Sequence, residues 1–343
     1  MVYSLWKHKV LRCCAHAFAY ACDSAYGAWL KAHYPYEFYV TMLKLYTEKG
    51  NKDKIVAIIN EMKRYKQIKL LPGKWKQDNR DWSVDKENNT ISQSLSSIKD
   101  ISQQTADELF TLSQSSSAWI GTEFIKTKEK DEEGNFIFEE KSYTADLDCF
   151  TNVLRAIQMN TSVKVNQIKV LIGIGYFHQF GGNAKLMKVF DEFIDGKNKL
   201  SKKIKSFNKR LASIRDYESS LPDDFINIRE QLFVENNNIG LCLSTDPNAP
   251  GNLFFIQEID DKFGVKLMLY NVRRGTIGTV RVRKDSFGFM NLAENQCIFL
   301  DNWEKKQKYS YKEGRKTPID GEYDVWLRKC TVANRESYQP SIL

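Results

Sequence analysis

The chain of 343 residues lacks the features typical of secreted, zinc-binding or membrane-spanning proteins. Its seven cysteines form no C-x-x-C pair and no zinc-finger spacing, and an odd number fits a disulfide framework poorly. We therefore expect reduced thiols. No stretch contains about 18 uninterrupted apolar residues, because Arg12 and His16 interrupt the apolar run near the start. These absences predict a cytoplasmic protein that is neither secreted nor membrane-spanning.

Residues with catalytic or metal-binding chemistry are also scarce. Only four histidines are present, two of them within His16–Pro35, and they suggest no nucleophile-and-base arrangement. The one D-x-D motif, Asp146-Leu147-Asp148, lies in "TADLDCF", which reads as the start of a helix capped at Thr144. On a helix, side chains at i and i+2 point apart, so we expect neither a catalytic residue nor a metal site here.

The composition that is present predicts a folded α+β protein of several domains. Hydrophobic residues make up 42% and aromatic residues 13% of the chain, and the net charge of +8 favours polyanionic partners. Helical periodicity over residues 16–32, 35–46 and 52–65 predicts a helical first domain, and "LLPGKW" ends it near residue 75.

Residues 76–200 are predicted to mix strands and helices. A charged insertion reads as a hairpin turning at Glu133-Gly134-Asn135, followed by the helix capped at Thr144. A second helix, "VNQIKVLIGIGYF", is stopped by Gly173 or Gly175. Because Gly173-Ile174-Gly175 follows a helix rather than a strand, it does not indicate a dinucleotide site.

The last third of the chain changes from helices to strands. Residues 201–250 are predicted to hold connecting helices, the first of them a basic helix that begins near 196 and ends at a Pro break. Over residues 251–335, "NLFFIQEI", "VKLMLYNV", "TIGTVRVRK" and "QCIFLDNWEKKQKY" read as short strands. This pattern predicts a small all-β barrel, for which an oligonucleotide-binding barrel is one candidate.

The segment His16–Pro35 combines two unlike helix faces. His16, Tyr20 and Lys31 fall on one polar stripe at 100° per residue, and small residues lie opposite. A phosphate-bearing ligand suits a stripe of imidazole, phenol and ammonium groups. The alternative is an ordinary amphipathic helix with a solvated polar face.

The same segment closely resembles the last long fingers helix of the bacterial DNA polymerase III alpha subunit, a family C replicative polymerase. The matching residues are His16, Ala19-Tyr20-Ala21 and the run Ala28-Trp29-Leu30-Lys31-Ala32-His33-Tyr34-Pro35. Weaker similarity continues in the same order through "PYEF", "IKLLPGKW", "ISQSLSSIKDISQQTADEL", "VNQIKVLIGIGYFHQFGG" and "NNIGLCLSTDP". The resemblance covers most of the chain, strongly in the first 35 to 70 residues and thinly at the C-terminus.

The resemblance implies a C-terminal portion of that subunit, active in DNA replication. His16, Tyr20 and Lys31 would contact a deoxynucleoside triphosphate or the template. The family's catalytic aspartates lie upstream in the palm, so Mg²⁺ is expected only there and this chain needs a palm-bearing polypeptide to extend a primer. Its own catalytic activity is left open. The implied DNA partners are a duplex primer-template and a single-stranded template.

Two further segments carry predicted DNA contacts. Where the family has a helix-hairpin-helix with a G-x-G hairpin, this chain has Asp100-Ile101-Ser102. That favours a structural hairpin, with Lys99, Ser102 and Gln103 as the contacts otherwise. In the barrel, basic residues lie next to aromatic ones, a combination that suits single-stranded DNA, although a solvated barrel face would show the same pattern. These barrel residues are Arg273, Arg274, Arg281, Arg283, Lys284, Phe287 and Phe289.

Alternative readings remain at this point. "REQLF", Arg229 to Phe233, resembles the short peptides that bind sliding clamps, but it also reads as an ordinary helix. The second hypothesis for the whole chain is a non-catalytic, single-stranded-DNA-binding accessory protein of replication, and the third is an unrelated helical interaction protein.

Overall fold

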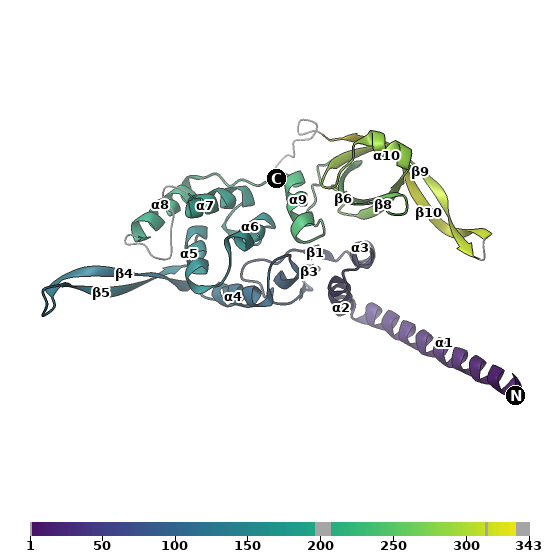
Figure 1. Ribbon diagram of the computed structural model, residues 1–343, viewed down its shortest axis with the longest axis horizontal. Helices are drawn as coiled ribbons and strands as arrows, with labels where there is room; N and C mark the ends of the chain where they lie inside the picture. Colours follow the sequence, from purple (N-terminus) through teal and green to yellow (C-terminus); the bar gives the residue numbers. More distant parts are fainter. Residues whose placement is uncertain (1, 196–206, 313–314, 334–343) are drawn as a thin grey trace. The chain divides into compact units, whose positions relative to one another are not determined.

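The computed structural model describes residues 2–195, 207–312 and 315–333 (Figure 1). Both helices and strands contribute substantially, which confirms the predicted α+β class. The chain divides into two compact units: residues 1–70 with 82–92, and residues 71–81 with 93–343. Within the described residues, no helix combines the length and the apolar character needed to cross a bilayer.

The first unit is built from three helices and a small sheet. The helices are α1 (Val2–His33), α2 (Pro35–Glu48) and α3 (Lys52–Glu61), with a π-helical turn over Met62–Lys66. The three helices predicted in this region are confirmed. The strands β1 (Lys69–Leu71), β2 (Ser83–Asp85) and β3 (Thr90–Ser92) pair in the order β1-β3-β2. Strands of three residues are too short to give a period-two signal, so the sequence did not predict them.

The core of this unit lies between α2 and α3. Tyr39 and Leu43 of α2 are buried, and Ile55, Ile58 and Ile59 form the buried side of α3 at helical spacing. α3 begins where the Asn51 side chain accepts a hydrogen bond from the Lys54 backbone N–H. Over residues 16–33, α1 contributes no buried side chain.

The helical part of the second unit surrounds one apolar core. Its helices are α4 (Gln103–Ser113), α5 (Phe150–Asn160), α6 (Val165–Gly173), α7 (Asn183–Asp195), α8 (Phe207–Ser220) and α9 (Ile228–Asn238). Single 3₁₀ turns lie at Leu95–Ser97 and His178–Phe180. α6 ends at Gly173, and Gly175 follows with φ +81°, as predicted. The predicted basic helix is confirmed from Phe207 onward, and its first part lies outside the described residues.

A long hairpin projects from these helices. β4 (Ser117–Lys130) and β5 (Phe136–Asp146) pair antiparallel, and Gly134 in the turn has φ +85°. The predicted hairpin is therefore confirmed. The predicted helix start at Thr144 is wrong, because Thr144 pairs with Trp119 inside β5 and α5 begins only at Phe150. The α5 N-terminus is capped instead by the Glu218 carboxylate, which accepts hydrogen bonds from the Phe150 and Thr151 backbone N–H groups.

Five strands close into a barrel after α9. They are β6 (Leu253–Asp260), β7 (Val265–Asn271), β8 (Ile277–Val282), β9 (Cys297–Lys312) and β10 (Arg315–Val332), with α10 (Lys284–Met290) between β8 and β9. The closed order is β10-β8-β7-β6-β9, and only β8 and β10 pair parallel. The four predicted strands are confirmed, whereas β10 was not predicted. β9 and β10 continue beyond the barrel as a hairpin (Figure 1).

Candidate nucleic-acid interface

The predicted stripe on α1 lies partly in solvent. His16 and Tyr20 are exposed, Tyr20 to 61%, and their rings meet edge-on with centroids 4.8 Å apart. Lys31 differs, because its ammonium group is ion-paired with Glu61 and lies 6.0 Å from the Phe38 ring centroid. The structure thus leaves the imidazole and phenol accessible, while the predicted cation already has a partner within its own unit.

A second aromatic row on α1 was missed by sequence reasoning. Tyr26 stacks on Trp29 at 6.2 Å, and Trp29 stacks on His33 at 4.5 Å, with all three side chains exposed. These residues follow the i, i+3, i+7 spacing of one helix face. The spacing of these rings in the sequence was the available signal for a stacked surface row.

The expected helix-hairpin-helix is present only in part. Its first helix is the single 3₁₀ turn Leu95–Ser97, and only its second helix, α4, is a regular α-helix. Asp100 adopts φ +63° at the position of the family's first hairpin glycine. Ser102 caps α4 by accepting a hydrogen bond from the Thr105 N–H at 3.2 Å. The hairpin therefore keeps a glycine-like backbone although it carries a carboxylate.

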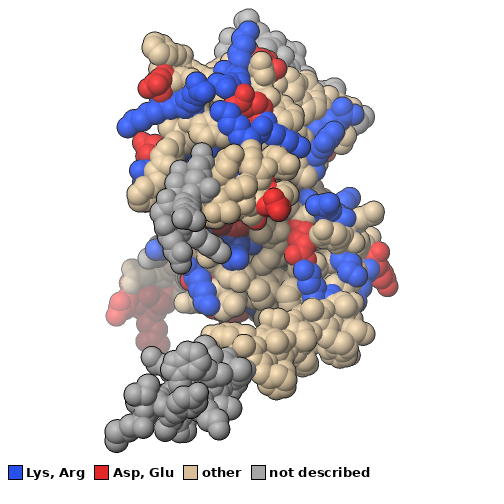
Figure 2. Space-filling model, turned by 90° about the vertical axis from the view of Figure 1, so that its right-hand side faces the viewer, with Lys and Arg blue, Asp and Glu red and all other residues tan. Residues whose placement is uncertain are grey.

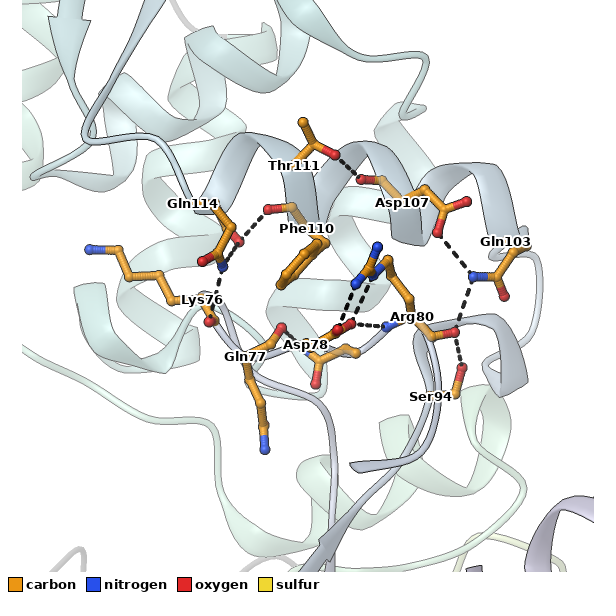
Figure 3. Close-up of polar contacts among 12 residues, drawn as sticks. Lys76, Gln77, Asp78, Arg80, Ser94, Gln103, Asp107, Phe110, Thr111 and Gln114 are labelled. Atoms are coloured by element: carbon orange, nitrogen blue, oxygen red, sulfur yellow. Dashed lines mark hydrogen bonds and ion pairs between the residues drawn. The ribbon is translucent and has the colours of Figure 1, made fainter. Parts of the chain in front are cut away.

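The three predicted hairpin contacts differ in availability. Lys99 and Ser102 are exposed. Gln103 is also exposed, but its Nε2 donates to the Arg80 carbonyl and to Asp107 Oδ1, both at 3.1 Å (Figure 3). Gln103 therefore joins α4 to the segment before it, and the Ser102 hydroxyl is engaged in capping α4, which leaves the exposed Lys99 as the most accessible of the three.

Arg80, which lies beside this hairpin, makes contacts within its own unit. Its guanidinium group donates to both Asp78 carboxylate oxygens, at 2.9 and 2.7 Å, and lies 4.2 Å from the Phe110 ring centroid (Figure 3). The hydrogen bond from Arg80 lowers the pKa of Asp78 below its ordinary value. The cation and ring together hold the loop against α4, so Arg80 is a structural rather than a DNA-binding arginine.

The predicted basic residues of the barrel fall into two groups. Arg273 and Arg274 lie in the β7–β8 turn, and Arg283 and Lys284 lie where β8 passes into α10; all four are exposed. Arg281 within β8 lies 3.1 Å from the Asp324 carboxylate of β10. The β8–β10 pairing thus gives this predicted DNA contact an acidic neighbour 43 positions away in the sequence.

The two predicted aromatic residues of the barrel differ in their exposure to solvent. Phe287 is partly buried against the barrel core, so it is not a free stacking surface. Phe289 is 91% exposed. Of the two rings, Phe289 therefore offers the larger accessible stacking surface.

The β9–β10 hairpin adds surface residues that sequence reasoning missed. Trp303, Tyr309 and Tyr323 are exposed, and Lys306 lies 5.0 Å from the Trp326 ring centroid. Figure 2 draws the face on the right-hand side of Figure 1, and Lys and Arg side chains cover its upper part with Asp and Glu among them. Several hairpin cations are paired, as Lys308 is with Glu322 at 2.6 Å. The alternation of lysines and aromatic residues in "NWEKKQKYSY" was the signal available.

The segment that resembles a clamp-binding peptide is helical. It lies in α9, where Leu232 is buried and Gln231 is hydrogen-bonded to Asn183 and Glu235. Phe233 is exposed. This arrangement matches the ordinary-helix alternative rather than an extended peptide.

The D-x-D motif joins β5 to α5. Asn152 Nδ2 donates to the Asp146 carbonyl at 2.8 Å and to Asp148 Oδ1 at 3.0 Å, and Leu147 between them is buried. Across the described ranges, no three or more His, Cys, Asp or Glu side chains gather as a metal site. The motif therefore shapes a strand-to-helix junction.

Comparison with known proteins adds no family to this picture. No protein-family model matches the chain, and no curated protein matches it in sequence. The resemblance to family C polymerases therefore depends on the residues quoted above.

Proposed function

We propose that the chain is the C-terminal portion of a family C DNA polymerase alpha subunit and takes part in DNA replication. It contributes nucleotide, template and DNA contacts, and a palm-bearing polypeptide supplies the catalytic aspartates and their Mg²⁺. The proposal is supported by the spaced match on α1, where His16 and Tyr20 face solvent.

The observation that carries the DNA-binding part is the barrel. Oligonucleotide-binding barrels have five strands in a Greek-key order, and they bind nucleic acid through the face of their second and third strands and through flanking loops. Here β7 and β8 hold those places, and the closed order with one parallel pair fits this description. The exposed Arg273 and Arg274 lie in the turn that joins these two strands.

Primer extension tests the polymerase proposal. A palm-bearing family C polypeptide mixed with this chain should extend a primed template in the presence of Mg²⁺, and Lys31→Ala should reduce that extension. Because Lys31 is ion-paired with Glu61, Glu61→Gln is the matched control for simple loss of the pair. Extension that Lys31→Ala leaves unchanged, or that Glu61→Gln reduces equally, argues against a nucleotide contact by Lys31.

The second candidate is a non-catalytic accessory protein that binds single-stranded DNA. It is favoured by the barrel, whose exposed basic and aromatic residues do not involve α1. Under this candidate, single-stranded DNA binding is salt-sensitive and is unaffected by Tyr20→Ala, and the chain stimulates no extension. A loss of binding on Tyr20→Ala contradicts it.

A further inference from the structure

The β4–β5 hairpin forms a two-stranded sheet of its own. Every side chain from residue 131 to 142 is exposed, including the consecutive apolar residues Phe136, Ile137 and Phe138, the last to 58%. A two-stranded hairpin is marginally stable in water, and adjacent exposed apolar residues are typical of interaction surfaces. The base of the ribbon packs on the helical core, whereas residues 131–142 leave apolar side chains such as Phe138 largely exposed to solvent.

The base of the hairpin is nevertheless firmly attached to α5. The buried Arg155 donates from Nε to the Ile120 carbonyl at 2.7 Å and lies 5.3 Å from the Phe207 ring centroid. Asn160 Nδ2 donates to the Trp119 carbonyl of β4, and Asn152 Nδ2 to the Asp146 carbonyl of β5. Since side chains of α5 are hydrogen-bonded to the backbone of both strands, the hairpin projects from the helices from a fixed base (Figure 1).

The charge of this arm opposes that of the remaining chain. Residues 117–146, here named the acidic arm, contain eight acidic residues and four lysines, a net charge of −4. The whole chain carries +8, so the rest carries +12. The barrel, residues 251–333, contains 15 basic and 11 acidic residues, a net charge of +4. Its exposed Arg273, Arg274, Arg283 and Lys284 make no ion pair within the described part of the chain.

We propose that the acidic arm of one copy docks on the barrel of a second copy. Two copies otherwise repel each other, because each carries an excess of positive charge away from the arm. An arm-to-barrel contact is head-to-tail, so its two surfaces are different and complementary. Phe136 and Phe138 supply apolar area, and the four basic residues of the barrel supply the opposite charge.

The expected complex is weak and salt-sensitive. About nine residues of each strand extend past the clamped base, a length of about 30 Å at about 3.3 Å per residue. One face of such a ribbon covers less area than the roughly 800 Å² per partner of a standard stable interface. Charge attraction therefore carries much of the affinity, and raising the salt concentration should weaken it.

Sedimentation velocity of the full chain at about 0.05 M and about 0.5 M salt tests the proposal. We expect concentration-dependent association at low salt that is lost at high salt. The variant Glu132→Gln, Glu133→Gln, Glu140→Gln should stay monomeric. The control Glu48→Gln, Glu87→Gln, Asp216→Asn changes net charge equally at exposed positions outside both the arm and the barrel and should associate as before. A monomeric full chain at low salt, or equal association of both variants, overturns the proposal.

Mixing two variants tests the head-to-tail geometry. The barrel variant replaces the four unpaired basic residues, Arg273, Arg274, Arg283 and Lys284, by Gln. Neither it nor the arm variant should associate alone, but the mixture should form a one-to-one complex, since one supplies an intact arm and the other an intact barrel. A mixture that stays monomeric overturns the proposal, and circular dichroism melts confirm that each variant is folded.

Discussion

At the scale of single residues, two buried glutamates stabilise the second unit. Glu218 caps α5, and Glu235 accepts hydrogen bonds from the Leu243 and Ser244 N–H groups at 2.6 and 3.0 Å. Removing a carboxylate leaves buried N–H groups without partners, at a cost of about 1–3 kcal/mol each.

Glu235→Ala should therefore lower the free energy of unfolding by about 2–6 kcal/mol, since it leaves two N–H groups without a hydrogen-bond acceptor. Glu235→Gln should cost less, because the amide oxygen still accepts one hydrogen bond. Chemical denaturation measures both, with the exposed Glu230→Gln as a control of about 0.5 kcal/mol or less. An Ala variant as stable as this control contradicts the role given to Glu235.

The thiols make a second prediction at this scale. Burial raises the pKa of Cys149 and of Cys297 to about 11, and Cys22 is exposed. A folded-state pKa above the unfolded value means that the stabilisation is complete below pH about 9 and is lost as the pH rises toward 11. Cys149→Ser should reduce this alkaline loss in denaturation curves. In native protein at pH about 8, mass spectrometry should find Cys22 alkylated before Cys149 or Cys297; the reverse order contradicts this account.

At the scale of elements, the hairpin before α4 offers a direct test. Asp100 has φ +63°, a conformation that costs a non-glycine residue up to about 1–2 kcal/mol. Asp100→Gly should raise stability slightly and, if the hairpin approaches a phosphate, raise duplex DNA affinity in fluorescence anisotropy. Asp100→Asn removes only the charge and tolerates this backbone, so it separates the two effects. Unchanged affinity in both variants would show that the hairpin is only structural.

Local patterns predicted the elements whose determinants are local. The α2 and α3 helices follow from apolar spacing and from Pro35 and Asn51 at their starts. β10 was missed because Pro318 and Gly321 interrupt its pattern, and its pairing with β9 and β8 overrides them. The true cap of α5 was likewise invisible, since Glu218 is 68 positions from Phe150.

In the candidate site too, the sequence predicts local properties such as exposure but not contacts between distant residues. The exposure of Tyr20, Arg273 and Phe289 agrees with the sequence interpretation. The partners of Arg281 and Lys31 depend on which strands and helices lie together, and one sequence contains no signal for that.

At the scale of the whole molecule, we propose that this basic chain binds DNA through its barrel. Each phosphate neutralised on a single strand contributes about −0.7 to the slope of log affinity against log salt concentration. A chain with several unpaired barrel cations should therefore bind a thymidine oligonucleotide with a clearly negative slope.

The most direct measurement is fluorescence anisotropy of a labelled thymidine oligonucleotide titrated with the full chain across a salt series. We expect binding at low salt, a slope of about −2 to −3, and a slope less negative by about 1.4 in the double variant Arg273→Ala, Arg274→Ala. The exposed Lys209→Ala, in α8, is the control and should leave the slope unchanged. Absence of binding at low salt, or binding that the barrel variant does not alter, would contradict the account.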